Sequence, residues 1–287
     1  MIELQNEFLR IRIKEKGAEL CSLQTPDGLE YLWQAEPSVW PRHAPVLFPI
    51  VGRLKNNTYS CGQEPYSLPQ HGFARDCDFD CVVKTDKEIS MDLQADQETL
   101  RLYPFLFHLR ITYSLVGAAL RTTYTVKNTG ENDLLFSIGA HPGFNCPLLK
   151  GERLEDYYLE FEQEELQRTL LQDGLLSNRT ETLVLQQRQL PLSHSLFDAD
   201  ALVFANNQIR KVWLRSKNHQ RALSMDCEGW PWFGIWSKKG EHPFICLEPW
   251  MGITDKVESS GKLSEKAGII RLSPAHTYAC SFQISIF

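Results

Sequence analysis

The chain has 287 residues, of which 43% are apolar and 23% are charged, a composition typical of globular proteins. A disordered or collagen-like chain is therefore excluded. Acidic residues number 36 and basic residues 30, so the formal net charge is -6, and no basic block stands out. Because this charge repels nucleic acid and anionic membranes on average, we expect neither as a partner.

The N-terminal sequence has no cationic segment followed by an apolar stretch, and no run of about 18 apolar residues occurs, so we expect neither an export signal nor a membrane span. The eight cysteines are scattered without a CxxC pair, which is the spacing of a zinc ribbon or a redox motif. We therefore expect a cytoplasmic protein whose cysteines are reduced thiols, many of them packed as small apolar side chains.

Alternation of apolar and polar residues, the pattern of a half-buried strand, dominates the chain. A hairpin is expected where two such runs, 111–115 and 120–126, meet at Gly117 and Ala118. The only segment of helix-forming composition is 163–172. Further strands are expected, in chain order, at 8–13, 81–84, 134–138, 157–161, 212–214, 233–236 and 277–286.

Many short strands without a linker, a low-complexity tract or an internal repeat indicate one domain that spans residues 1–287. The expected fold class is all-β, a large antiparallel β-sandwich.

Three polar residues lie in apolar segments that glycine and proline punctuate: His71 in LPQHGFAR, His141 in GAHPGF and Glu248 in ICLEPW. Taken singly, each histidine is more simply a satisfied turn or core residue, and Glu248 a buried partner of an arginine. Together, two imidazoles and a carboxyl supply an acid and a base that can be tuned toward neutral pH. Burial raises the pKa of a carboxyl above its reference of about 4.3, which strengthens it as a base.

Other chemistries have weaker sequence signals. Two histidines and one glutamate can bind a metal, but neither HExxH nor HxH spacing occurs. The GxSxG motif of a serine nucleophile is absent as well. Tryptophans gather in GWPWFGIW, residues 229–236, and again at Trp250 beside Glu248. Most are expected in the core, yet a flat ring beside polar groups also suits the C–H face of a sugar.

Five segments together resemble the aldose 1-epimerase (galactose mutarotase) superfamily, and particularly its LacX-like branch. They occur in the order expected for that superfamily and span essentially the whole chain. They are PVLFPIVGR at 45–53, HGFAR at 71–75, AHPGF at 140–144, LFDADAL at 196–202 and CLEPW at 246–250.

The resemblance implies a β-supersandwich that interconverts the α and β anomers of a free aldose without a metal or an organic cofactor. It implies that Glu248 is the general base that removes the proton of the C1 hydroxyl, and that His141 is the general acid that protonates the ring oxygen. Arg53 and His71 then hold sugar hydroxyls and stabilise charge near C1. The implied partner is a small sugar, and the sequence carries no signal of oligomeric state.

The family also binds sugar hydroxyls with an aspartate late in the chain. Asp198 and Asp200 are both candidates here, and Asp200, just before an apolar run, is preferred. One departure concerns Arg53, which follows glycine in this chain and asparagine in typical galactose mutarotases. This difference predicts altered contacts around the sugar.

Another branch, the hexose-6-phosphate 1-epimerases, shares the LPQHGFAR block, with Arg75 at its end, and an arginine ahead of the Phe-Pro segment, where this chain has Arg42. Arginine suits phosphate because its planar fork donates two hydrogen bonds at once. Either arginine can instead form a structural ion pair. A phosphorylated hexose is thus the alternative substrate. A carbohydrate-binding protein without catalysis and a β-sandwich interaction module are the alternatives from other classes.

Overall fold

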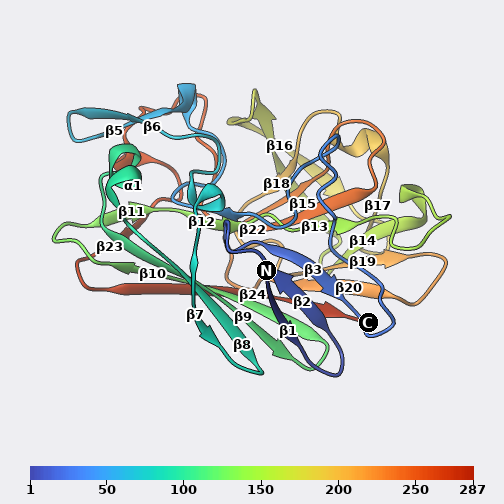
Figure 1. Ribbon diagram of the computed structural model, residues 1–287. Helices are drawn as coiled ribbons and strands as arrows, with labels where there is room; N and C mark the ends of the chain where they lie inside the picture. The colour runs from blue at the N-terminus through green and yellow to red at the C-terminus, as the bar shows by residue number, and fades with distance from the viewer.

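The computed structural model describes residues 1–287 and consists almost entirely of antiparallel strands (Figure 1). The all-β prediction is therefore confirmed. The largest sheet has nine strands, in the order β17 (Gln189–Pro191), β14 (Tyr157–Phe161), β19 (Lys211–Ser216), β20 (Ala222–Asp226), β24 (Thr277–Ile286), β10 (Ala119–Asn128), β9 (Phe107–Val116), β8 (Glu88–Gln94) and β7 (Asp80–Lys84).

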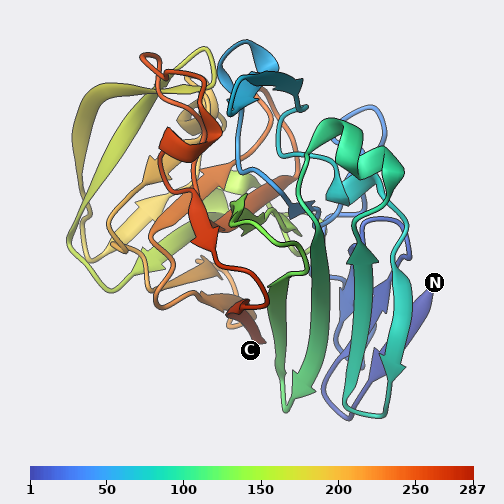
Figure 2. The same cartoon turned by 90° about the vertical axis from the view of Figure 1, so that its left-hand side faces the viewer.

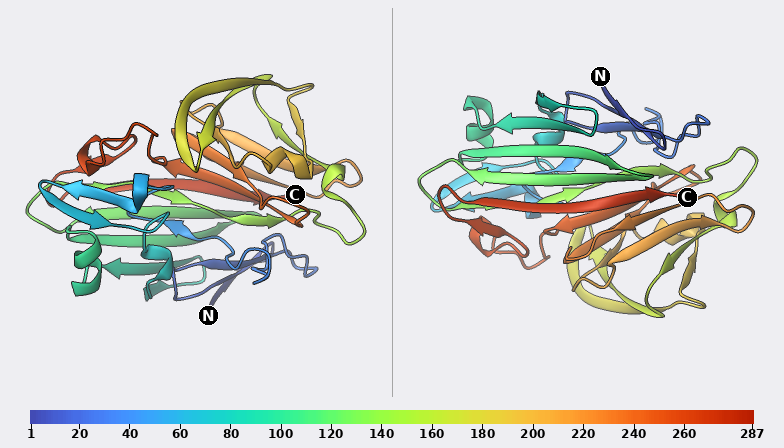
Figure 3. Two further views of the ribbon diagram at one scale, coloured as in Figure 1. Left: turned by 90° about the horizontal axis from the view of Figure 1, so that it is seen from above. Right: turned by 90° about the horizontal axis from the view of Figure 1, so that it is seen from below.

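A second sheet has eight strands and carries most of the features described below. Its order is β16 (Leu175–Val184), β15 (Glu165–Gln172), β18 (Leu202–Phe204), β21 (Trp232–Trp236), β22 (Phe244–Met251), β12 (Ile138–Ala140) and β4 (Val46–Leu47), and β13 (Gly143–Asn145) also pairs with β22. The β15–β16 hairpin projects to one side of the molecule (Figure 3).

The remaining elements are short. A three-stranded sheet contains β1 (Ile2–Gln5), β2 (Arg10–Ile13) and β3 (Leu20–Gln24), and two-stranded sheets pair β11 (Leu134–Phe136) with β23 (Ile270–Leu272) and β5 (Thr58–Cys61) with β6 (Glu64–Ser67). One α-helix, α1 (Gln97–Leu102), and single 3-10 turns at 55–57, 74–76, 154–156, 194–197 and 263–265 complete the structure. No helix has the length and apolarity that crossing a membrane requires.

The hairpin predicted around Gly117 is present as β9 and β10, which run side by side in Figure 2. Val116 pairs with Ala119, so the turn contains only Gly117 and Ala118, and Gly117 has a φ of 57°. Glycine adopts this conformation without steric cost. Residues of β9 alternate between buried and partly exposed, as the sequence pattern requires.

The helix expected at 163–172 is wrong. Residues Glu165–Gln172 form β15, which pairs with β16 on one side and β18 on the other. Pairing with the next strand, β16, and with the more distant β18 overrides the helix-forming composition of this segment. The single α-helix begins instead after Asp96, whose carboxylate accepts the Thr99 N–H at 2.7 Å in a capping box.

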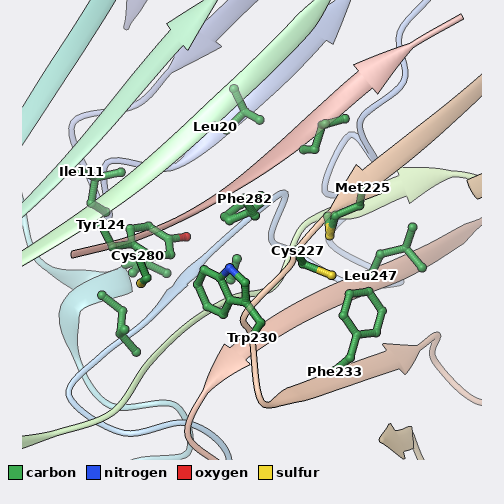
Figure 4. Close-up of a cluster of buried hydrophobic side chains, with 14 of the residues drawn as sticks. Leu20, Ile111, Tyr124, Met225, Cys227, Trp230, Phe233, Leu247, Cys280 and Phe282 are labelled. Carbon is green, nitrogen blue, oxygen red and sulfur yellow. The ribbon is translucent and has the colours of Figure 1, made fainter. Parts of the chain in front are cut away.

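The hydrophobic core lies between the two large sheets, because one cluster of 64 buried residues draws side chains from both. Figure 4 shows its centre, where Trp230 lies near Phe282 of β24 and Tyr124 of β10. The ring centroids of Trp230 and Phe282 are 5.9 Å apart. Phe233 of β21 and Leu247 of β22 face the same core from the second sheet. The eight cysteines are free thiols.

Candidate functional site

A cavity of about 550 Å³ opens on the face of the eight-stranded sheet that turns away from the core. Its walls come from segments that are far apart in the sequence. All seven residues that the sequence analysis proposes as catalytic or substrate-binding line it: Arg53, His71, Arg75, His141, Asp200, Glu248 and Trp250. The cavity volume falls in the range of about 300–1,000 Å³ that is usual for small-molecule sites.

The alternation of side chains along β22 explains why a carboxyl lies on this face. Ile245 and Leu247 point into the main core, whereas Cys246, Glu248 and Trp250 belong to the opposite face of the strand. Successive strand residues point to opposite sides of a sheet. An apolar run that is buried on both faces thus presents one acidic side chain to the cavity.

The indole of Trp250 fits between two glycines of neighbouring strands. Trp250 pairs with Gly139 of β12, and Glu248 pairs with Gly234 of β21. A Cβ atom on Gly234 would lie 2.4 Å from the Trp250 ring, and one on Gly139 would lie 2.8 Å from it. Only glycine leaves room for the ring at these two positions.

His141 follows β12 and lies beside Glu248. The strands on either side of it, β12 and β13, both pair with β22. The Nε2 atom of His141 is 3.2 Å from Oε2 of Glu248, and their side chains are 10% and 2% exposed. The ring of Trp40 stacks on the imidazole with a centroid distance of 4.9 Å, and Trp236 contacts it edge-on at 5.6 Å.

Burial shifts the pKa values of this pair in opposite directions. Burial raises the pKa of the Glu248 carboxyl well above its ordinary value, while the indole N–H of Trp250 acts against this shift. Burial, followed by the positive charges of Arg75 and Arg42, lowers the pKa of His141 to about 3. The site therefore holds a neutral imidazole next to an unusually basic carboxyl group.

His71 is fixed by the backbone of the loop that carries Arg53. The backbone N–H of His71 donates to the carbonyl of Gly52 at 2.8 Å. The backbone N–H of Gly52 donates in turn to the ring atom Nδ1 of His71 at 3.1 Å. Burial, followed by the neighbouring imidazole of His141 and the positive charge of Arg75, lowers the pKa of His71 well below its ordinary value. Because Nδ1 accepts a hydrogen bond, the neutral ring carries its proton on Nε2, which lies 3.3 Å from the side-chain amide of Gln70.

The loop of Arg53 is tied to the tip of the β15–β16 hairpin. The hydroxyl of Thr254 accepts the Arg53 N–H at 3.0 Å and donates to the carbonyl of Gly174 at 2.7 Å. The Arg53 guanidinium is 3.4 Å from the carbonyl of Asp173. These contacts bring Asp173 and Gly174 into the cavity wall.

The two arginines of the possible phosphate site differ in their surroundings. Arg42 lies outside the cavity wall and donates to both carboxylate oxygens of Asp76, at 2.9 and 3.3 Å. Arg75 lines the cavity and donates to the carbonyl of Gln70 at 2.6 Å. Burial, followed by the charge of Arg42, lowers the pKa of Arg75 to about 10, so it remains a cation near neutral pH.

Of the two candidate aspartates, only Asp200 lines the cavity. Asp198 caps the 3-10 turn at 194–197. Asp200 has a φ of 87°, and its carboxylate accepts the N–H of Ala201 at 2.7 Å. That backbone contact orients an exposed carboxylate beside the cavity.

Five polar or aromatic wall residues are absent from the site predicted from the sequence: Trp40, Gln70, Asp173, Trp236 and Thr254. Trp236 belongs to the aromatic segment singled out there, whereas Trp230 and Trp232 of the same segment do not line the cavity. No sequence signal marks Trp40 or Asp173, because tertiary contacts bring them to the site.

One group of possible metal ligands occurs at the cavity, but it is not the pair of histidines with a glutamate that the sequence allowed. It contains His141, Cys246 and Glu248, whose ligand atoms lie within 4.8 Å of one another. His71 is not part of this group.

Comparison with known proteins agrees with the fold and covers nearly the whole chain. A family model for aldose 1-epimerase matches residues 1–267. The relative described as "Protein LacX, plasmid", from Lactococcus lactis subsp. lactis, is 37% identical over 295 residues, which cover 99% of both chains.

Two solved structures show the same architecture. A galactose mutarotase related enzyme from Lactobacillus acidophilus has a TM-score of 0.95 and 34% identity, with 100% of this chain and 97% of that chain covered. A galactose mutarotase-like protein from Lactobacillus casei ATCC 334 has a TM-score of 0.94 and 33% identity, with both chains covered completely. The extent of the sequence matches and the identity of the LacX relative establish that this chain belongs to the aldose 1-epimerase family.

Proposed function

We propose that the protein is an aldose 1-epimerase that interconverts the α and β anomers of a free hexose by acid and base catalysis. The observation that carries this proposal is the contact between His141 and Glu248, 3.2 Å apart at the wall of a sugar-sized cavity. A buried carboxyl group with a raised pKa is suited to remove a proton from a hydroxyl group.

In the proposed mechanism, Glu248 accepts the proton of the C1 hydroxyl while an N–H of the neutral His141 ring donates to the ring oxygen. A neutral imidazole is an effective donor to an oxygen that gains negative charge. The C1 to ring-oxygen bond breaks, the aldehyde forms, and the proton on Glu248 passes to His141 across their contact. Rotation about C1–C2 exposes the other face of the carbonyl, and ring closure reverses the proton transfers.

The other wall residues are assigned to substrate binding. His71 and Arg53 donate to sugar oxygens and stabilise negative charge that develops near C1. The carboxylate of Asp200 accepts hydrogen bonds from hydroxyl groups, and the Trp250 ring offers an apolar surface to the C–H face of the sugar. The cavity thus combines a few placed polar groups with aromatic walls, as small-molecule sites usually do.

Polarimetry tests the activity. Freshly dissolved α-D-glucose and α-D-galactose are followed with and without the protein, and we expect the optical rotation to reach equilibrium faster in its presence. Sugar binding by the folded protein without acceleration would favour the non-catalytic carbohydrate-binding protein. Absence of both binding and acceleration would favour an interaction module.

The second candidate function is that of a hexose 6-phosphate 1-epimerase. It is favoured by Arg75, because this cation lies at the cavity wall, where it can bind a phosphate group. On that hypothesis, Arg75→Ala raises KM for glucose 6-phosphate roughly 10- to 150-fold, as expected for a charge-assisted hydrogen bond. Arg42→Ala is the comparison variant, because Arg42 lies outside the cavity wall and pairs with Asp76, whose carboxylate is also 3.8 Å from Arg75. We expect the wild type to prefer the free hexose. A kcat/KM about tenfold higher for glucose 6-phosphate would assign the phosphorylated substrate instead.

A further inference from the structure

The proposed mechanism makes no use of Cys246, although its thiol lies next to the acid and base pair. Cys246 precedes Glu248 by two residues on β22, so both side chains leave the strand on the same face. The sulfur, a ring nitrogen of His141 and a carboxylate oxygen of Glu248 all lie within 4.8 Å of one another. Cys246 is completely buried, and the Glu248 side chain is almost completely buried.

The spacing of these atoms is close to that of a tetrahedral zinc site. Zinc binds imidazole nitrogen and carboxylate oxygen at about 2.0–2.2 Å and thiolate sulfur at about 2.3 Å. At a tetrahedral angle, nitrogen and oxygen ligands are therefore about 3.3 Å apart, and sulfur and nitrogen ligands about 3.6 Å. The Nε2 to Oε2 distance of His141 and Glu248 is 3.2 Å. The sulfur lies within 4.8 Å of both atoms, so it has to approach them by at most about 1.2 Å.

The donor atoms are also free to accept an ion. Oε2 of Glu248 is buried without a hydrogen-bond partner, and the atom that approaches it at 3.2 Å, Nε2 of His141, belongs to the same group of ligands. A neutral imidazole, a thiolate and a carboxylate carry two negative charges, which balance the charge of a divalent cation in a buried site where a net charge would be costly. His141 and Glu248 line the cavity, so a fourth ligand such as water can approach from there.

We propose that His141, Cys246 and Glu248 form a binding site for Zn²⁺ that inhibits the enzyme by occupying its acid and base. Binding forms bonds from the metal to nitrogen, sulfur and oxygen and releases the thiol proton, together with any proton on Glu248, to solvent. The inhibition rests on the proposed function, whereas the binding site itself does not. A soft thiolate and an imidazole favour zinc or cobalt over magnesium or calcium.

Binding is tested with Co²⁺ as a spectroscopic probe on protein first treated with EDTA under reducing conditions. We expect one equivalent of Co²⁺ to produce a thiolate-to-cobalt charge-transfer band, and Zn²⁺ to remove that band by displacement. Cys246→Ser should abolish the band and weaken Zn²⁺ binding, measured by calorimetry, at least about tenfold, because even outer-sphere changes cost about 10- to 100-fold. Cys280→Ser, which alters a buried core thiol outside the site, should change neither.

Thermal unfolding establishes that each variant is folded, and Cys246→Ala repeats the test with a side chain that cannot ligate. A missing charge-transfer band in the wild type, or a band that persists in both Cys246 variants, would overturn the site. Mg²⁺ serves as the control cation and should have no effect at the same concentration.

Measuring the anomerisation rate with and without Zn²⁺ distinguishes the metal site from the proposed epimerase activity. We expect Zn²⁺ to slow anomerisation by the wild type and EDTA to restore it, with each variant compared with its own metal-free rate. Cobalt and zinc binding in a protein without epimerase activity would leave the metal site standing and refute the proposed function. Full epimerase activity, without the cobalt charge-transfer band and without inhibition by zinc, would refute the metal site and leave the proposed function standing.

Discussion

Glu248 lies in the interior of β22 with its carboxyl group almost completely buried beside His141. Glu248→Gln retains the shape of this side chain but cannot accept a proton. We expect the variant to lose anomerisation by about 10²- to 10⁴-fold, the usual contribution of a general acid or base. Polarimetry measures the rate, and equilibrium sugar binding is the control, because the cavity keeps its form. A rate close to that of the wild type would mean that another group is the base.

The raised pKa of Glu248 has a separate effect on stability. The folded protein holds this proton more tightly than the unfolded chain, so between the ordinary pKa and the raised one the unfolded state binds fewer protons. The carboxyl therefore contributes stability at low pH that is lost as pH rises through its folded pKa.

Glu248→Gln lacks this titration, so we expect its melting temperature to exceed that of the wild type by a margin that grows as pH rises from about 4.3 toward neutrality. Each kcal/mol corresponds to roughly 2–4 °C in a protein of this size class. Thermal unfolding of both proteins over this pH range measures the margin. A margin that shrinks with rising pH would show that burial does not destabilise the carboxylate.

At the residue scale, the sequence identified the polar centre of the site but not its surroundings. His141 and Glu248 were recognisable because glycine, proline and apolar neighbours mark unusual positions for polar side chains. Trp40 stacks on His141 from a separate loop, and Asp173 reaches the cavity from a hairpin tip. Those approaches depend on how distant segments pack, which no local pattern encodes.

At the scale of elements, the fit of Trp250 between β12 and β21 depends on two glycines. In Gly234→Ala, the new Cβ would lie 2.4 Å from the indole, so the buried ring must shift. We expect a loss of stability of about 1–3 kcal/mol, as for other overpacked cores. Anomerisation should also slow, because Gly234 pairs with Glu248. Chemical denaturation and polarimetry measure the two effects.

Gly130→Ala is the matched control for this substitution. Its nearest atoms outside the neighbouring residues are 3.5 Å from the added Cβ, an ordinary contact. Its free energy of unfolding should therefore stay close to that of the wild type. Equal losses in both variants would show that the Trp250 contact is not responsible.

Secondary-structure elements were predictable where the local sequence pattern favours the same structure as the strand pairing in the fold. In β9 and β10 the alternation of side chains and a glycine turn favour the hairpin that forms. In β15 the composition favours a helix, but the segment pairs with β16 and β18. The partner strand β18 begins 30 residues after β15 ends, so its influence is invisible in a short window of sequence.

At the scale of the whole molecule, the last strand of the chain lies at the centre of the largest sheet. β24 lies between β20 and β10, and the buried side chains of Phe282, Ile284 and Ile286 enter the main core. Each such side chain contributes about 1.5–3 kcal/mol, against a total stability of about 5–15 kcal/mol. Deletion of residues 277–287 should therefore abolish cooperative unfolding, measured by circular dichroism during heating.

Deletion of residues 1–5 provides the comparison. It removes β1, an edge strand of the three-stranded sheet, in which only Leu4 is buried. We expect this protein to remain folded with a lower melting temperature. Cooperative unfolding of the C-terminal deletion would show that the sheet tolerates a gap at its centre.

The β15–β16 hairpin contributes Leu171, Asp173 and Gly174 to the cavity, yet most of its residues are exposed or only partly buried. Changes on such a surface usually alter stability by less than about 0.5 kcal/mol. The wall that carries His141 and Glu248, in contrast, is backed by the core of the protein. For the proposed epimerase, selection can therefore reshape the hairpin to admit a different sugar while the proposed proton-transfer groups stay in place. In such an enzyme, the exposed hairpin can change with the substrate, and the wall backed by the core preserves the chemistry.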